Sequence, residues 1–142
     1  MIKQLLIAFS LVLIPLSAYA VCPDHKVTLC EIVQDNTWVL RATVESTQYI
    51  KDEDDLEGIA GWLYNLKITT DYRGKKTKHL SVRSENTTAR VNLETGKEYF
   101  IFASENTMGV PETGNYCDNF TESYFSTALE EQIKSCIRTE KH

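Results

Sequence analysis

Four cysteines are the residues best suited to chemistry in this 142-residue chain, and their spacing favours disulfides over metal binding. Cys22 and Cys30 lie near the start of the chain, and Cys117 and Cys136 lie near its end. No Cys-x-x-Cys pair is present, so the ligand spacing of a structural zinc site is missing. In an oxidising compartment an even number of cysteines predicts two disulfides, and the residues alone leave all three pairings open.

The sequence contains no recognisable motif for catalysis or metal binding. His25, His79 and His142 are scattered outside any pattern such as His-Glu-x-x-His, so we predict surface positions for them. There is no Gly-x-Ser-x-Gly nucleophile elbow and no glycine-rich phosphate loop. The acidic residues 52–57 lack the alternating spacing and the turn glycine of a calcium-binding EF-hand loop. The sequence therefore predicts a non-enzymatic protein with no cofactor and no metal site of its own.

The first residues predict export. Lys3 is followed by the apolar run Leu5–Leu16, and the sequence Ala18-Tyr19-Ala20 matches an A-x-A cleavage site. We expect residues 1–20 to be a signal peptide and the mature chain to be a soluble secreted or periplasmic protein, without a membrane segment after cleavage. A lipid anchor at Cys22 is the alternative, but bacterial lipidation requires a small residue where this chain has Val21.

Length and charge narrow the range of partners. Residues 21–142 are of a size typical of a single domain, which we predict to be monomeric. The formal net charge is −5 for the whole chain, and it becomes more negative once Lys3 is removed. An acidic protein is poorly suited to binding nucleic acid or an anionic membrane. Asn86 and Asn119 begin Asn-x-Thr sequences, which are glycan acceptors only in a eukaryotic host.

Strands must position the candidate residues named above. A period-two alternation of apolar residues predicts where these strands lie. Every even-numbered residue from Trp62 to Tyr72 is expected on one face of the second strand. The predicted strands cover Thr37–Thr47, Trp62–Tyr72, Leu80–Val82, Ala89–Leu93 and Glu98–Ser104, and the predicted loops cover 51–58, 73–76, 94–97 and 105–116. We expect most of the interior to come from Trp38, Leu40, Ala42, Val44, Leu66, Ile68, Val82, Tyr99, Ile101 and Ala103.

Helices are predicted at both ends of the mature chain. Asp24–Val33 is expected to form a short helix, with Asp24 as its N-cap and with Val27, Cys30 and Val33 facing inward. Apolar residues recur at helical spacing from Phe125 to Ile137 and predict a terminal amphipathic helix. Five strands in a meander with helices at both ends predict a mainly β fold, a closed barrel of the oligonucleotide/oligosaccharide-binding (OB) type.

Several features in one order resemble the netrin-like module, and specifically the N-terminal domain of the tissue inhibitors of metalloproteinases. They are an early pair and a late pair of cysteines, Val39-Leu40-Arg41-Ala42-Thr43-Val44, Tyr64-Asn65-Leu66-Lys67-Ile68-Thr69-Thr70-Asp71-Tyr72-Arg73-Gly74-Lys75, and Gly96-Lys97-Glu98-Tyr99-Phe100-Ile101-Phe102-Ala103. The resemblance implies an OB-type barrel. It also implies two disulfides, Cys22–Cys117 and Cys30–Cys136.

The chain departs from those inhibitors at the residues that bind the protease zinc. They open with Cys-x-Cys, and their first cysteine offers its amine and carbonyl to the metal. Here the first position is Ala20, and the position of its disulfide partner falls near Ala89-Arg90. By resemblance, the Val21 amine could chelate a partner's zinc, with Val21, Cys22 and Pro23 as the protease contact. The alternatives are an adaptor without inhibitory activity, which would recognise another extracellular protein through the acidic loop 51–58, and ligand binding on the barrel face.

Overall fold

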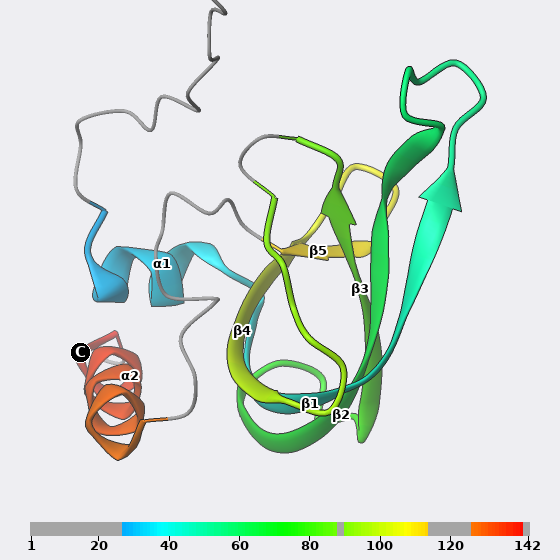
Figure 1. Ribbon diagram of the computed structural model, residues 1–142. Helices are drawn as coiled ribbons and strands as arrows, with labels where there is room; N and C mark the ends of the chain where they lie inside the picture. The colour runs from blue at the N-terminus through cyan, green and yellow to red at the C-terminus, as the bar shows by residue number, and fades with distance from the viewer. Residues whose placement is uncertain (1–26, 88–89, 114–125, 141–142) are drawn as a thin grey trace, which may run out of the picture.

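Residues 27–87, 90–113 and 126–140 are described by a computed structural model in which strands predominate (Figure 1). The elements are α1 (Leu29–Asp35), β1 (Trp38–Lys51), β2 (Ile59–Arg73), β3 (His79–Glu85), β4 (Glu98–Glu105), β5 (Pro111–Thr113) and α2 (Thr127–Thr139). The five strands close into a barrel in the order β1-β2-β3-β5-β4. This confirms the predicted mainly β fold, a five-stranded barrel with short flanking helices. In these described ranges, no helix has the length and apolar character needed to cross a membrane.

The identity of the fifth strand differs from the prediction. Residues 90–93 of the expected strand Ala89–Leu93 are not in a strand, although Val91 and Leu93 are buried. Their backbone instead bonds to the Tyr64 hydroxyl, which donates to the Val91 carbonyl and accepts from the Leu93 N–H. The fifth strand is β5, inside the expected loop 105–116. It runs parallel to β3 and antiparallel to β4, so the strands do not form a simple meander.

The barrel interior is the larger of two apolar clusters and matches the predicted core closely. All ten predicted residues belong to it, with Ile68 only partly buried. Residues that the prediction left out complete the cluster: Tyr64, Val91 and Leu93, with Trp62 and Leu80 packed against it. The alternation of side chains along β1 and β4 therefore does determine which residues face inward.

β-bulges change the face predicted for the end of β2. Ala42 pairs with Ile68 and Arg41 with Thr70, which leaves Thr69 as an extra residue in β2. An extra residue reverses the faces of the residues that follow it. Tyr72 accordingly packs outside the barrel, with its ring 6.3 Å from that of Phe100. The prediction that Tyr72 shares a face with Trp62 was wrong for this reason.

Both helices cover the outer face of β1 and β4 (Figure 1). α1 and α2 enclose a second apolar cluster with the outward-facing side chains of the barrel: Ile32, Val33, Val39, Phe100, Phe102, Ile133 and Cys136. α1 begins later than predicted because Thr28 and Glu31 form a capping box. Thr28 therefore replaces Asp24 as the N-cap, and Val27, which was expected inside the helix and facing inward, precedes the helix and is exposed.

One disulfide fastens the two helices together. Cys30 in α1 is bonded to Cys136 in α2, and their Cα atoms lie 5.1 Å apart. This confirms one of the two predicted bridges. Arg73 reinforces the junction by donating to the Val33 carbonyl at 2.7 Å and by pairing with Glu140 just after α2. Cys22 and Cys117, the other predicted pair, lie outside the described residues, as does the predicted signal peptide.

Candidate protein-binding site

The structure describes only part of the predicted site. Val21, Cys22 and Pro23 lie outside the described residues, whereas the acidic loop lies within them. His79 is at the surface as predicted, and its ring Nδ1 lies 3.2 Å from a carboxylate oxygen of Glu45. In residues 27–87, 90–113 and 126–140, no group of histidine, cysteine, aspartate and glutamate side chains is arranged to hold a metal ion.

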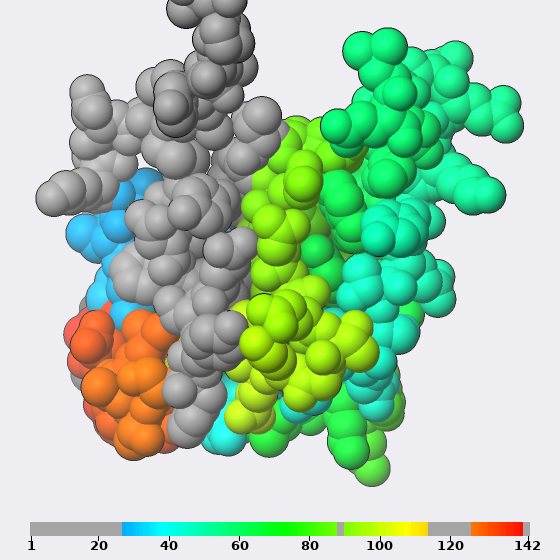
Figure 2. All heavy atoms as spheres, in the orientation of Figure 1, coloured from blue at the N-terminus to red at the C-terminus, as the bar shows by residue number. Residues whose placement is uncertain are grey.

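The β1–β2 hairpin is the most prominent feature of the described surface (Figures 1 and 2). β1 pairs with β4 only from Trp38 to Thr43, whereas its pairing with β2 continues to Lys51 and Ile59. The hairpin therefore continues beyond the closed barrel. We call residues 45–61 the projecting hairpin. Its loop is the acidic segment predicted from the sequence.

Large apolar side chains are exposed on the projecting hairpin. Tyr49 is 67% exposed and Leu56 is 106% exposed, so neither side chain contributes much burial to the fold. Tyr49 makes an edge-on contact with Trp62 at the end of the hairpin, with ring centroids 6.2 Å apart. The guanidinium of Arg90 lies 4.6 Å from the centre of the Trp62 ring, within the range of a cation–π interaction. Tyr49, Trp62 and Arg90 thus form a continuous ledge, which we call the aromatic ledge.

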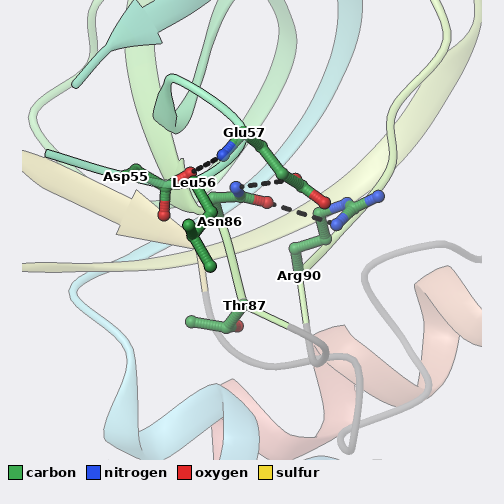
Figure 3. Close-up of a pocket in the computed structure, with 6 residues that line it drawn as sticks. All are labelled: Asp55, Leu56, Glu57, Asn86, Thr87 and Arg90. Atoms are coloured by element: carbon green, nitrogen blue, oxygen red, sulfur yellow. Dashed lines mark hydrogen bonds between the residues drawn. The ribbon is translucent and has the colours of Figure 1, made fainter. Parts of the chain in front are cut away.

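Asn86, at the end of β3, holds the hairpin in place (Figure 3). Its amide Nδ2 donates to the Ile59 carbonyl at 2.9 Å and to Glu57 at 3.2 Å, and its Oδ1 accepts from Arg90 at 3.3 Å. Its backbone N–H donates to the Ala60 carbonyl at 3.0 Å. Asn86 therefore fixes both the base of the acidic loop and the arginine of the aromatic ledge. A glycan on Nδ2 would disturb the hydrogen bonds of this predicted acceptor.

A shallow hollow of about 300 Å³ lies beside Asn86, between the acidic loop and the segment after β3. Its lining is Asp55, Leu56, Glu57, Asn86, Thr87 and Arg90 (Figure 3). The loop is shaped by its own carboxylates, since Asp52 accepts from the Asp54 N–H and Asp55 from the Glu57 N–H. Gly58 closes the loop with φ +72°, a conformation that favours glycine. The lining of the hollow is therefore mixed, because it combines two carboxylates and the Arg90 guanidinium with the apolar side chain of Leu56.

Comparison with known proteins adds no family: no protein-family model matches the chain, and no curated protein is significantly similar to it.

Sequence reasoning found the acidic loop and missed the aromatic ledge. The predicted first strand ends at Thr47, so the prediction does not include Tyr49. A usable signal was present, because Tyr49 and Ile50 have high strand propensity and extend the strand toward the loop. The contact of Arg90 with Trp62 joins segments far apart in the chain, and no local pattern indicates it.

Proposed function

We propose that this chain is a secreted, non-enzymatic module that binds another protein. The observation that carries the proposal is the exposure of Tyr49 and Leu56 on a hairpin that continues beyond the barrel. Exposed apolar groups that gather at one place, rimmed by polar residues, are characteristic of interaction surfaces. Tyrosine, tryptophan and arginine, the residues of the aromatic ledge, are also those enriched at the energetic centres of protein interfaces.

Inhibition of a zinc metalloprotease is the more specific form of this proposal. Its support is the resemblance to the metalloproteinase inhibitors, together with a barrel and a Cys30–Cys136 bridge of the kind that the resemblance implies. In this form the mature chain begins at Val21, and its α-amine binds the protease zinc. The amine must be neutral to do so, and an α-amine titrates near pH 8, so inhibition strengthens as the pH rises toward about 8. Without the missing disulfide, Val21 is held from one side only, which lowers affinity.

The test of the inhibitor form compares three preparations against a panel of zinc endopeptidases. They are the mature protein with a free Val21 amine, the same protein with an acetyl cap, and a form with one extra alanine before Val21. We expect inhibition by the free form alone. Equal inhibition by capped and free forms would exclude the amine mechanism, and no inhibition by any form would leave the adaptor form of the proposal.

The adaptor form is tested on the projecting hairpin. A double variant, Tyr49→Ala with Leu56→Ala, removes the exposed apolar groups, and Met108→Ala is the matched control because Met108 is 72% exposed in the β4–β5 loop. A partner captured from secreted proteins is purified and its affinity is measured directly. We expect the double variant to weaken binding by about tenfold or more, as for interface hot spots, and the control to leave it unchanged. Equal affinity of the double variant and the native protein would contradict the proposed surface.

A further inference from the structure

We propose that the projecting hairpin binds its partner by strand addition: an extended, basic segment of the partner pairs with the open edge of β1 at Thr47 and Tyr49. This inference rests on the proposed protein-binding function and specifies its mode. Strand addition uses main-chain hydrogen bonds for affinity and alternate side chains for specificity.

The hydrogen bonds around β1 show where its open edge begins. The Val44 N–H donates to the Lys97 carbonyl and the Val44 carbonyl accepts from Gly96, so the β4 side of β1 is occupied as far as Val44. A bulge between Val44 and Ser46 follows. From Ser46 to Lys51, no strand in the described ranges pairs with that side.

The direction of the backbone N–H and carbonyl groups along β2 identifies which residues of β1 face the open edge. The Ile68 N–H donates to Lys78 and the Ala60 carbonyl accepts from Asn86, so even-numbered residues of β2 direct their backbone toward β3. Odd-numbered residues of β2 therefore direct theirs toward β1. Their β1 partners are Ser46, Gln48 and Ile50. Thr47 and Tyr49, which alternate with these, direct N–H and carbonyl groups toward the open edge.

In the described ranges, the features that protect this edge lie at its ends: a bulge at Val44/Ser46 precedes it and Lys51 follows it. Between them, the Thr95 hydroxyl lies 3.4 Å from the Thr47 hydroxyl, a side-chain contact that leaves the backbone of the edge unpaired by the described strands. Natural proteins block open edges with proline, lysine, bulges or a covering segment. Between the bulge at Val44/Ser46 and Lys51, the sequence Ser-Thr-Gln-Tyr-Ile has no proline, glycine or charge. The aromatic ledge lies beside it, since Tyr49 pairs directly with Trp62 in the register of the hairpin. A side chain of the added strand can therefore pack on exposed aromatic surface.

Charge decides between a basic partner and a second copy of this chain. The open edge is bounded at one end by Glu45 and at the other by Lys51 and the acidic loop, whose carboxylates are those of Asp52, Glu53, Asp54, Asp55 and Glu57. Lys51 is the one basic residue among these six carboxylates, so the edge is acidic on balance. Two copies paired antiparallel through this edge would bring the acidic loop of each copy beside Glu45 of the other, and like charges side by side are unfavourable. A segment with lysine or arginine at its ends meets opposite charge instead, which favours its association.

The experiment uses the mature protein and a synthetic probe, Lys-Val-Thr-Val-Thr-Val-Lys, observed by NMR. We expect this peptide to shift the amide signals of Thr47 and Tyr49 and to slow their hydrogen exchange. Two control peptides keep the length of the probe: one has glutamate ends, and the other is N-methylated at its internal residues. Each should bind at least about tenfold more weakly, because the first loses charge complementarity and the second loses two or more hydrogen bonds.

Variants of the protein test the same edge from the other side. Thr47→Pro removes one edge-facing N–H, and Thr47→Val keeps it. Both variants remove the hydroxyl that lies 3.4 Å from that of Thr95, so this contact does not distinguish them. We expect the proline variant to lose peptide binding about tenfold or more and the valine variant to keep it. If the proline variant fails to fold, the N-methylated peptide still makes the comparison on the native protein.

Four results would overturn strand addition. They are equal binding by the N-methylated peptide, absence of hairpin shifts with any peptide, binding that ignores the charge of the peptide ends, and edge amides already protected in the free protein by its own chain or by a second copy. After any of these results, the proposed function still holds if the double variant Tyr49→Ala, Leu56→Ala binds a purified partner more weakly than the native protein does. The proposed function fails separately if that variant binds as the native protein does.

Discussion

The two halves of β1 meet opposite environments, although they belong to one continuous strand. From Trp38 to Val44 the strand has neighbours on both edges, and its even-numbered side chains fill the barrel. From Ser46 to Lys51 it pairs with one neighbour among the described strands, β2, and Tyr49 is largely exposed. The bulge between Val44 and Ser46 marks the change. One strand of a small barrel thus carries both buried core residues and the surface that we propose for binding, and a single bulged residue, Glu45, separates the two.

The largest expected effect lies in the buried body of the molecule. Phe100 is fully buried between the barrel and the helices. We expect Phe100→Ala to cost about 3–5 kcal/mol of unfolding free energy, since it removes buried surface and leaves a cavity. Urea unfolding followed by fluorescence measures it. A loss below about 1 kcal/mol would mean that the helices do not pack on β4 as described.

The disulfide should rank next. Cys30→Ala with Cys136→Ala removes a bridge between residues 106 positions apart. We expect a loss of about 2–4 kcal/mol, typical of a bridge that restricts the unfolded chain. The unfolding midpoint of the double variant in urea gives the value. Unchanged stability would contradict a role for the bridge in holding α1 to α2.

A smaller, pH-dependent effect is expected where α2 meets the end of β2. The Tyr72 hydroxyl donates to Glu130 at 2.5 Å. This hydrogen bond lowers the pKa of Glu130, while burial, followed by the hydrogen bond to Glu130, raises the pKa of Tyr72. A lowered carboxyl pKa stabilises the fold above the unfolded value of about 4.3, and the gain is lost as the pH falls through the folded value.

Tyr72→Phe should therefore destabilise the protein at pH 7 and cost progressively less as the pH falls below about 4. The urea midpoints of the native protein and the variant, measured at pH 7 and below about pH 4, give this difference. Tyr49→Phe removes an exposed hydroxyl from the projecting hairpin and is the matched control, with no expected dependence on pH. A constant cost for Tyr72→Phe across this range would show that the Glu130 carboxylate does not depend on the tyrosine.

The smallest effect on stability is expected at the hairpin loop. Leu56 is fully exposed, so Leu56→Ala should change the unfolding free energy by less than about 0.5 kcal/mol. The same urea experiment checks it beside Phe100→Ala. A loss above about 1 kcal/mol would show that Leu56 packs against another part of the chain, which would remove it from the proposed binding surface.

The sequence predicts the body of this molecule better than the hairpin, for physical reasons. Burial imposes alternation, so Trp38, Leu40, Ala42 and Val44 reveal their shared face directly. β5 is only three residues long and begins with proline, so it leaves almost no periodic signal. At Val91 and Leu93 the sequence predicts a strand that the structure does not contain. These residues alternate as in a strand, but their backbone groups bond to the Tyr64 hydroxyl.

The candidate site was only partly predictable because its parts come together through tertiary structure. The acidic loop is evident from composition, but its relation to Asn86 and Arg90 depends on how β3 ends. The bulges that turn Tyr72 outward and mark the open edge of β1 follow from register, which no local pattern specifies. Val21, Cys22 and Pro23 stay predictions, as does the bridge between Cys22 and Cys117.

Amide hydrogen exchange along β1 in the free protein tests the central claim most directly. NMR resolves the rate at each residue, and both halves of the strand are measured in one sample. We predict that the Thr47 and Tyr49 amides exchange on the order of a hundredfold faster than those of Val39 to Val44, because the former face an open edge and the latter belong to a stretch that is paired on both edges. Equally slow exchange along the whole strand would contradict the account, since it would show that the edge is covered.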